Sequence, residues 1–353
     1  MRKIKVGIIG QGRSGRGIHA VTLIKLMQDK YQIVAVCDPI AERCEPSKNE
    51  TGCATYTDYR EMLKDRNIDL FINASPSNLH VPITHEILDA GFDVVTEKPL
   101  ARRVSDVDGI IAKAKKTKRL FTIFQQSRFA PYFLKVREII DSGVLGRVAM
   151  IKIAFNNFAR RWDWQTLQEM DAGILLNTGP HPLDQALQLF GEAEPDVFCL
   201  MDKVNSAGDA EDHVKLILSA KGSPTIDLEI SCCCAYPLYT YQVYGSHGSL
   251  TGDMKKIEWK YFIEGEAPEM KLIREPLPNL GWCSEKLPWK NGEWNVPAEE
   301  SNLFDCITSR YYGALYETIV NKSTLAITPA QVRRQIAVIE ECHRQNPLPR
   351  MKS

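Results

Sequence analysis

The stretch Ile4-Lys5-Val6-Gly7-Ile8-Ile9-Gly10-Gln11-Gly12-Arg13-Ser14-Gly15 decides how the chain begins to fold. An apolar run that predicts a strand leads into glycines spaced Gly-x-Gly-x-x-Gly, and a helical pattern follows over 15–29. In such a turn Gly10 permits a tight bend, Gly12 lets the backbone approach a pyrophosphate, and Gly15 allows close packing of the helix. The amide groups at the start of that helix would bind the phosphates. The stretch therefore predicts a dinucleotide-binding turn.

An acidic residue, Asp38, ends the second predicted strand about 20 residues after the turn, at the position that binds ribose in such folds. Its carboxylate would accept hydrogen bonds from the adenosine ribose hydroxyls and would repel a 2′-phosphate. We therefore expect NAD as the cofactor, with NADP the less favoured alternative. Gln11, Arg13 and Ser14, inside the turn, are expected to contact the cofactor too.

Short apolar runs alternate with helical patterns through the first third of the chain. Strands are predicted at 4–9, 32–37, 68–74, 92–96 and 119–124, and helices at 15–29, 57–65, 80–90 and 104–117. This alternation is typical of an α/β fold with a doubly wound parallel sheet. We assign residues 1–124 to this NAD-binding domain. Two strands end at Ser75-Pro76 and at Lys98-Pro99, which places these residues at the carboxyl edge of the sheet, where ligands bind.

The pattern changes after residue 124. Long runs with strand character follow at 147–157, 196–204, 212–219, 225–235, 239–244 and 257–263, with helices predicted at 131–142, 173–190, 301–321 and 329–345. This spacing indicates an α+β domain, 125–353, with a large, mostly antiparallel open sheet. Residues 265–300, rich in Pro, Gly and Trp, are expected to form a long irregular excursion.

The composition limits the classes of function. Lys and Arg number 44, as do Asp and Glu, so the chain lacks the basic field expected of a protein that binds nucleic acid or an anionic membrane. No apolar run approaches the roughly 20 residues of a membrane span. The ten cysteines contain no Cys-x-x-Cys pair, so we expect free thiols and no metal site. We expect a soluble, cytoplasmic protein, because the N-terminus reads as a strand and not as a signal peptide.

Four blocks of sequence together resemble the Gfo/Idh/MocA family of oxidoreductases (glucose–fructose oxidoreductase, inositol dehydrogenase and relatives). They are the glycine turn, Ala74-Ser75-Pro76-Ser77-Asn78-Leu79-His80, Thr96-Glu97-Lys98-Pro99-Leu100-Ala101, and the block from Gly173 to Asp184 that contains Asn177-Thr178-Gly179-Pro180-His181. A weaker fifth is Gly245-Ser246-His247-Gly248-Ser249-Leu250. The resemblance implies an N-terminal Rossmann domain and a C-terminal domain whose open sheet commonly mediates oligomerisation. It also implies that the cofactor is contacted by Ser75, Pro76, Asn78, His80, Glu97 and Lys98.

The resemblance assigns catalytic roles to Lys98 and His181. Lys98 would reach both the nicotinamide ribose and the substrate, and an ammonium group there can polarise a carbonyl. His181 would be the acid/base, because imidazole exchanges protons near neutral pH. Asn177 departs from the family pattern: many relatives carry Asp there, and an amide can orient a hydroxyl but cannot take up a proton. Asp184 could support His181 from the next helical turn or could serve packing alone.

Two further groups are candidates for ligand contacts. Gln126 and Arg128 resemble the family's crossover segment, in which a polar side chain often contacts nicotinamide; a hydrogen bond between the domains is the alternative. Arg160, Arg161, Trp162, Asp163 and Trp164 combine aromatic faces with charged groups, which suits a carbohydrate pocket. A place in the core is the alternative for the tryptophans. We list Arg160, Trp162, Trp164 and Asn177 as expected substrate contacts, beside Lys98 and His181.

These observations predict an NAD-dependent dehydrogenase or reductase that acts on a secondary alcohol of a sugar, cyclitol or related polyol. One alternative is a glycosidase or epimerase that oxidises and re-reduces its sugar with NAD retained. The other is a non-catalytic regulator that senses dinucleotide, which the presence of both Lys98 and His181 disfavours. We expect a homodimer or homotetramer, because the strand-rich half would leave a sheet face uncovered.

Overall fold

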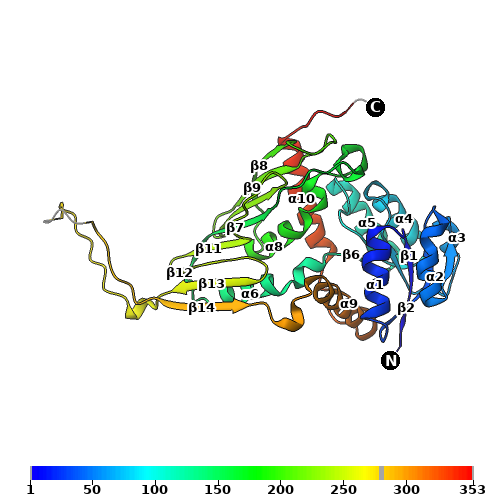
Figure 1. Ribbon diagram of the computed structural model, residues 1–353, viewed down its shortest axis with the longest axis horizontal. Helices are drawn as coiled ribbons and strands as arrows, with labels where there is room; N and C mark the ends of the chain where they lie inside the picture. Colours follow the sequence, from blue (N-terminus) through cyan, green and yellow to red (C-terminus); the bar gives the residue numbers. More distant parts are fainter. Residues whose placement is uncertain (1, 278–281, 352–353) are drawn as a thin grey trace.

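The computed structural model describes residues 2–277 and 282–351 and contains two sheets (Figure 1). The N-terminal sheet is parallel throughout, in the order β3-β2-β1-β4-β5-β6 of a Rossmann fold. Its strands are β1 (Ile4–Ile9), β2 (Tyr31–Cys37), β3 (Ala54–Tyr56), β4 (Leu70–Asn73), β5 (Asp93–Thr96) and β6 (Phe121–Ile123). The doubly wound sheet predicted from the alternating pattern is confirmed, and the short edge strand β3 is an addition to the predicted set.

Helices connect these strands. A π-helical turn, Gly15–Ala20, continues into α1 (Val21–Lys25), and the later connections contain α2 (Glu45–Thr51), α3 (Tyr59–Met62), α4 (His80–Asp89) and α5 (Val104–Thr117). Strands β1, β2, β4, β5 and β6 are largely apolar and buried, as expected where helices cover both faces of a parallel sheet, whereas the edge strand β3 is mostly exposed. The carboxyl ends of β1, β2, β4 and β5 consequently meet at one edge.

The C-terminal sheet has the order β14-β13-β12-β11-β7-β10-β9-β8, and every neighbouring pair is antiparallel except β7 and β10. Its strands are β7 (Val148–Asn156), β8 (Asp196–Asp202), β9 (His213–Ser219), β10 (Thr225–Ser231), β11 (Tyr241–Gly245), β12 (Gly248–Gly252), β13 (Lys256–Tyr261) and β14 (Lys290–Asn295). The mostly antiparallel sheet is confirmed. The expectation of an irregular excursion over all of 265–300 is wrong, because β14 pairs with β13 along its whole length.

One face of this sheet is covered by helices and lies toward the Rossmann domain (Figure 1). The helices of the C-terminal part are α6 (Pro131–Asp141), α7 (Ile174–Asn177), α8 (Pro180–Phe190), α9 (Leu303–Asn321) and α10 (Pro329–Gln345). The single helix predicted over 173–190 is divided into α7 and α8 by the turn at Thr178 and Gly179, which is followed by Pro180. Proline favours the first turn of a new helix because it has no N–H to donate.

Helix α10 packs on both sheets, and α9 packs on the Rossmann domain. Helix α9 contacts α1, while α10 contacts α5 and β6 as well as β8 and α8. Tyr311 in α9 donates a hydrogen bond to the Ile123 carbonyl of β6. The end of the chain thereby holds the two sheets together. No helix within residues 2–277 and 282–351 is long and apolar enough to cross a membrane.

Candidate functional site

Three glycines in the turn after β1 have different surroundings. Gly10 has φ +89°, a conformation that favours glycine, and a Cβ on Gly15 would lie 1.8 Å from the Gly10 carbonyl oxygen. Around Gly12, by contrast, no described atom lies within 4 Å of the place a Cβ would take. The first and third glycines are therefore required by the chain itself, whereas the second keeps space open beside the backbone.

That space is part of a cavity of about 330 Å³ at the carboxyl edge of the parallel sheet. Its lining comes from the ends of four strands and from one loop of the C-terminal domain: Gly10, Gly12, Arg13, Ser14, Asp38, Arg43, Ala74, Ser75, Pro76, Ser77, His80, Glu97, Lys98, Asp163, Trp164 and Gln165. The open space at Gly12, the helix start behind it and a carboxylate at the end of β2 fit the pyrophosphate and ribose of a dinucleotide. The residues present therefore suit NAD.

Asp38 is 4% exposed and sits at the end of β2. Its two carboxylate oxygens accept backbone N–H groups from Gln11 at 2.8 Å and from Ile40 at 3.0 Å. Arg43, which the sequence analysis did not single out, lines the same cavity and brings a guanidinium nitrogen to 3.7 Å from Asp38 Oδ1. The end of the cavity expected to hold the ribose thus contains a carboxylate and a guanidinium side by side.

Glu97, at the end of β5, is held by a buried hydrogen-bond chain. His19 Nε2 lies 3.1 Å from Glu97 Oε1, and His19 Nδ1 lies 2.6 Å from the Tyr312 hydroxyl of α9. Burial alone would raise the pKa of Glu97, but His19, together with the Lys98 charge, lowers that pKa to about 2. Glu97 is therefore a permanent anion within this chain of contacts, and its Oε2 accepts the Lys98 backbone N–H at 3.0 Å.

Lys98 follows Glu97 and points toward the C-terminal domain. Its ammonium group donates a hydrogen bond to the Asn177 backbone carbonyl at 2.7 Å and lies 3.5 Å from Asn177 Oδ1. Burial, and then the nearby charges of Arg13 and Arg161, lower the pKa of Lys98, while Glu97 opposes the shift. The structure thus brings together Lys98 and Asn177, residues that are 79 positions apart in the sequence.

His181 lies in the first turn of α8, just after the turn that follows Asn177. Its Nδ1 is buried and has no hydrogen-bond partner among the described residues. Burial, and secondarily the charge of Lys98, lower the pKa of His181 to about 3. The imidazole is therefore neutral at physiological pH, and its Nδ1 is an unpartnered nitrogen, among the described residues, that a ligand hydroxyl could contact.

The remaining predicted cofactor contacts divide into two groups. Ser75, Pro76 and His80 line the cavity, and the buried His80 ring lies between the Pro99 and Ser75 carbonyl oxygens at 2.6 and 2.8 Å. Asn78 is exposed and is not among the described lining residues. The Gln11 side chain turns away from the cavity, because its oxygen accepts the Ser47 hydroxyl at 2.7 Å.

The expected substrate contacts are also unevenly placed. Trp164 lines the cavity beside the glycine turn, whereas Trp162 is 84% exposed and, like Arg160, is absent from the described lining. Arg161 forms a bidentate ion pair with Asp163, at 3.0 and 2.6 Å. Of this cluster, Asp163 and Trp164 reach the cavity directly.

A second cavity, of about 450 Å³, borders Thr178, the residue after Asn177. It is lined by the end of β7, by the segment before β11 and by the turn after β12: Ala154, Phe155, Asn156, Asn157, Thr178, Pro237, Leu238, Tyr239, Thr240, Asp253, Met254 and Lys255. Amides, hydroxyls and an aromatic ring suit a polyhydroxylated ligand. Sequence reasoning missed this cavity because, apart from Thr178, its residues come from three separate segments without a motif.

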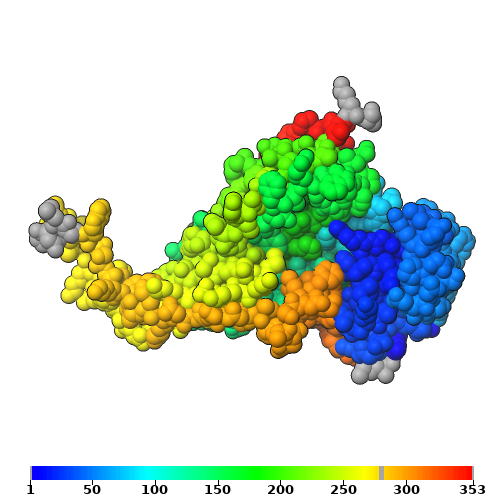
Figure 2. All heavy atoms as spheres, viewed as in Figure 1, coloured from blue at the N-terminus to red at the C-terminus, as the bar shows by residue number. Residues whose placement is uncertain are grey.

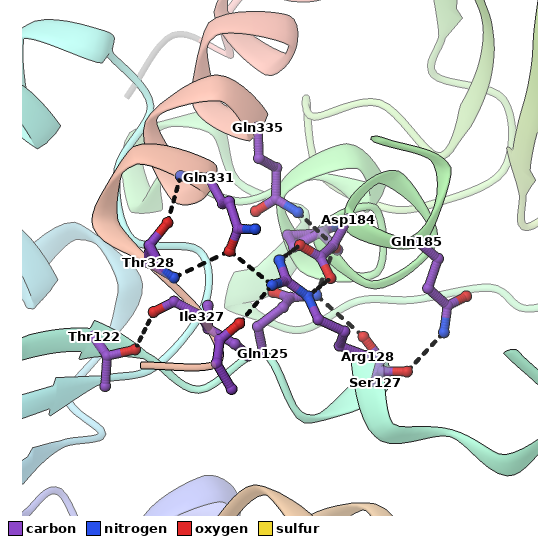
Figure 3. A network of polar contacts seen from close by, with 12 residues as sticks. Thr122, Gln125, Ser127, Arg128, Asp184, Gln185, Ile327, Thr328, Gln331 and Gln335 are labelled. Atoms are coloured by element: carbon purple, nitrogen blue, oxygen red, sulfur yellow. Dashed lines mark hydrogen bonds and ion pairs between the residues drawn. The ribbon is translucent and has the colours of Figure 1, made fainter. Parts of the chain in front are cut away.

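Asp184 does not support His181 directly. Its carboxylate pairs with Arg128 of the crossover segment, Nε to Oδ2 at 2.9 Å and Nη2 to Oδ1 at 2.5 Å (Figure 3). Arg128 therefore serves a contact between segments, the alternative given for it above. Gln126, two residues earlier, is buried, and its Oε1 has no partner in the described part of the chain.

Comparison with known proteins agrees with this geometry. Residues 4–125 match a family model described as an oxidoreductase family with an NAD-binding Rossmann fold, and residues 133–251 match the GFO/IDH/MocA C-terminal domain. The chain is 30% identical to myo-inositol 2-dehydrogenase of Thermotoga maritima over 71% of this chain and 75% of that protein. It is 26% identical to scyllo-inositol 2-dehydrogenase (NADP(+)) IolW of Bacillus subtilis over 96% of this chain and 92% of that protein.

A solved structure shows the same fold. The WlbA dehydrogenase from Bordetella pertussis, in complex with NADH and UDP-GlcNAcA, superposes with a TM-score of 0.76 at 21% identity. The superposition covers 100% of both chains. The overall fold is therefore shared across the whole length.

Proposed function

Because the chain belongs to the GFO/IDH/MocA oxidoreductase family, we propose that it transfers hydride between NAD and a secondary alcohol or ketone of a sugar, cyclitol or related polyol. The family makes the chain an oxidoreductase with an NAD-binding domain. The observation that carries the proposal is the contact of Lys98 with Asn177, which joins the edge of the dinucleotide cavity to the segment that bears His181. The inositol dehydrogenases among the relatives support a polyol as substrate.

The chain's own residues would hold the cofactor at the edge of the parallel sheet. The helix start after Gly12 offers N–H groups to the pyrophosphate, and Asp38 offers carboxylate oxygens to the adenosine ribose. Bound NAD supplies the hydride acceptor or donor. Lys98 and Glu97 line the same cavity and define the end at which the reaction would take place.

Proton transfer falls to His181 and charge stabilisation to Lys98. A neutral His181 accepts the proton of the substrate hydroxyl as the alcohol is oxidised, and it returns that proton in the reverse direction. Lys98 donates a hydrogen bond to the same oxygen and stabilises its developing negative charge. Asn177 accepts the Lys98 ammonium through its backbone carbonyl at 2.7 Å and through its side-chain oxygen at 3.5 Å, which leaves its NH₂ group to donate to a neighbouring hydroxyl.

The rest of the substrate would occupy the cavity beside Thr178. Asn156, Asn157 and Thr240 offer groups that hydrogen-bond to hydroxyls, and Tyr239 offers an aromatic face for the C–H side of a ring. A volume of about 450 Å³ accommodates a sugar or cyclitol together with a further group. This cavity therefore supports a polyol in preference to a small hydroxy acid.

A screen of sugars and cyclitols, myo-inositol among them, for NADH formation at 340 nm tests the proposal. On any accepted substrate, His181→Ala should lower turnover by about 10²–10⁴-fold while NAD affinity stays nearly unchanged. Lys98→Ala should lower turnover similarly and also weaken NAD binding, because Lys98 lines the cofactor cavity. A His181→Ala enzyme with wild-type turnover would refute the role given to this residue.

We also propose that the protein is a homodimer or homotetramer. The face of the C-terminal sheet opposite the helices exposes Phe198 and Leu200, at 56% and 55%. In addition, residues 266–277 and 282–288, between β13 and β14, extend away from the body (Figures 1 and 2), and Met270 and Trp282 are 86% and 95% exposed. Apolar surface of this extent is usually covered by a partner. A monomer mass by light scattering at micromolar concentration would refute this proposal.

A cytoplasmic location is consistent with the cysteine chemistry. All ten cysteines are free thiols, and Cys199, Cys232 and Cys342 are among the buried ones. Free thiols in this number suit a reducing compartment. Fractionation of the cells that express the chain, with detection by antibody, tests this assignment.

A further inference from the structure

Arg128 and Asp184 form an ion pair that is almost completely buried, at 7% and 5% exposure. Arg128 belongs to the crossover segment that follows β6, and Asp184 belongs to α8, one turn after His181. The pair is bidentate, which fixes direction as well as distance. It therefore ties the helix that bears His181 to the segment that leaves the Rossmann sheet.

The same helix start is held by a second set of contacts (Figure 3). The Pro180 carbonyl, adjacent to His181, accepts the side-chain amides of Gln125 and of Gln335 in α10, both at 2.7 Å. Gln185, next to Asp184, donates to the Ser127 carbonyl at 2.7 Å. The first turn of α8 is thus anchored from the crossover segment and from α10 together.

Arg128 extends this anchorage to the start of α10. Its Nη1 donates to the Ala326 carbonyl at 2.8 Å and to Gln331 Oε1 at 2.7 Å. Gln331 belongs to the capping box of α10, in which the Thr328 hydroxyl accepts the Gln331 N–H. The Arg128 guanidinium therefore contacts both α8 and the cap of α10. Arg128 itself follows β6, the last strand of the parallel sheet, by five residues.

Burial of an ion pair is a weak source of stability, because the desolvation of both charges offsets most of their attraction. Two apolar side chains of similar size would fill the same space with little loss of stability, and often with a gain. They would not impose the direction and register that the four hydrogen bonds donated by Arg128 impose. The contribution specific to the pair is therefore geometric.

We propose that Arg128 and Asp184, with Gln125 and Gln335, are positioning residues that set the location of His181 relative to the cofactor edge. The inference rests on the role proposed above for His181. Residues three apart on a helix have Cβ atoms about 5–6 Å apart, so a shift of Asp184 carries His181 with it. A misplacement of about 1 Å at a reacting group can cost about 10²-fold in rate.

The experiment compares single and double variants of the pair on the best substrate of the polyol screen. Arg128→Met and Asp184→Asn should each lower both the melting temperature and kcat, while the NAD dissociation constant changes by less than about threefold, since neither residue lines that cavity. Arg128→Met/Asp184→Leu should regain the melting temperature but keep kcat at least about tenfold below wild type. Recovery of kcat together with stability in the double variant would overturn the proposal.

A matched control comes from the same helix α10. Arg333 forms a bidentate pair with Asp108 of α5, at 2.6 and 3.1 Å, on the exposed surface and away from α8. Asp108→Asn should leave kcat within about twofold of wild type, because a surface pair contributes about 0–1 kcal/mol. A loss of kcat in this control equal to that of Asp184→Asn would also overturn the proposal, because any contact of α10 would then have the same effect.

A readout independent of turnover follows His181 directly. Protein labelled with [¹³Cε1]-histidine gives one imidazole signal per histidine, and the His181 signal is the one lost in His181→Gln. The double variant should shift or broaden this signal, and Asp108→Asn should leave it in place. An unmoved signal in the double variant would refute positioning even if His181 is catalytic; full turnover of His181→Ala would refute the proposed function and the inference together.

Discussion

The glycine turn after β1 and the turn before α8 both carry residues of the candidate site, but they are built in opposite ways. An added Cβ at Gly10 would lie 2.3 Å from the Ala74 carbonyl oxygen, and one at Gly15 would lie 1.8 Å from the Gly10 carbonyl oxygen, so the turn is fixed by close backbone packing. The segment around His181 is held by side chains from the crossover and α10, up to 155 positions away. The first turn is thus fixed by backbone packed within the parallel sheet, and the second by side chains from distant segments.

This difference explains why the two regions respond differently to change. The glycine turn has no adjustable contact: added atoms at Gly15 would overlap a carbonyl oxygen. The His181 turn is held by a set of long polar side chains, and the loss of one leaves the others in place. We therefore expect abrupt losses from changes at the first and graded losses from changes at the second.

Substitution within the glycine turn should have the largest effect. Gly15→Ala should lower the free energy of unfolding by on the order of 3 kcal/mol or more, because its Cβ would overlap the Gly10 carbonyl. Gly12→Ala should leave stability within about 1 kcal/mol but weaken NAD binding at least about tenfold, since the methyl group enters the pyrophosphate space. Denaturant titration and calorimetry measure the two quantities.

The control for the glycine variants is Gly17→Ala, where no described atom lies within 4 Å of the added Cβ. It should change neither stability nor NAD affinity by more than about 1 kcal/mol. Equal stability of Gly15→Ala and Gly17→Ala would show that the turn is not held by its own backbone.

Asn177→Asp examines the contact between the two regions. The new carboxylate beside Lys98 would raise the pKa of that lysine, against the downward shift it now has, and would remove the amide donor. We expect kcat/KM to fall at neutral pH by a factor that corresponds to a loss of about 1–3 kcal/mol of transition-state stabilisation. The pH profile of kcat/KM checks this, with Asn78→Asp, at an exposed position, as the control. A kcat/KM at or above that of the wild type would show that a carboxylate works at position 177 at least as well as the amide, so that the amide donor is not needed.

The imidazole of His181, whose Nδ1 is buried, should make stability depend on pH. Its folded-state pKa, about 3, lies below the ordinary 6.5, so the unfolded chain binds the proton first as the pH falls. The folded state therefore loses stability as the pH falls from about 7 toward 3, by at most about 2 kcal/mol from this residue at pH 5. Melting temperatures of wild type and His181→Gln at pH 7 and 5 measure it; parallel decreases in the two proteins would contradict the assignment.

The smallest expected effect concerns the choice of dinucleotide. Asp38 should make NAD bind at least about tenfold more tightly than NADP, about 1.4 kcal/mol. Arg43→Ala should weaken NADP binding further and leave NAD binding nearly unchanged, because this guanidinium is the cation closest to the Asp38 carboxylate. Calorimetric titration with NAD and with NADP measures both dissociation constants. Equal dissociation constants in the wild type would count against the role of Asp38.

Local patterns were sufficient for the elements with a strong period or motif. The alternation of strands and helices predicted the parallel sheet, and Asp38, Ser75 and Lys98 were placed at its edge because parallel strands end together. Strand β12 was not predicted, because Gly248–Gly252 has a glycine at each end. Strand β14 was not predicted either, because its sequence, Lys290–Asn295, is polar and contains a glycine. It forms a strand through its pairing with β13, a contact that no local pattern records.

For the site residues too, local sequence patterns did not predict which way a side chain points. Asp184 next to His181 suggested mutual support by helical spacing, yet its carboxylate turns to Arg128, which is 56 positions away. Trp162 and Trp164 are equivalent in the sequence, but Trp164 lines the cavity and Trp162 is exposed. In both cases the direction of a side chain depends on which distant element packs against it.

The sequence by itself determined the dinucleotide turn, the parallel sheet and the identity of the residues at the sheet edge, because each depends on neighbours within one strand–turn–helix unit. Only the tertiary structure decided which residues face one another: Lys98 and Asn177, Arg128 and Asp184, Glu97 and His19. These pairs join segments that are 56 to 79 positions apart. Their contacts form when burial of apolar surface brings the two sheets and the terminal helices together, and that free energy is shared by the whole core.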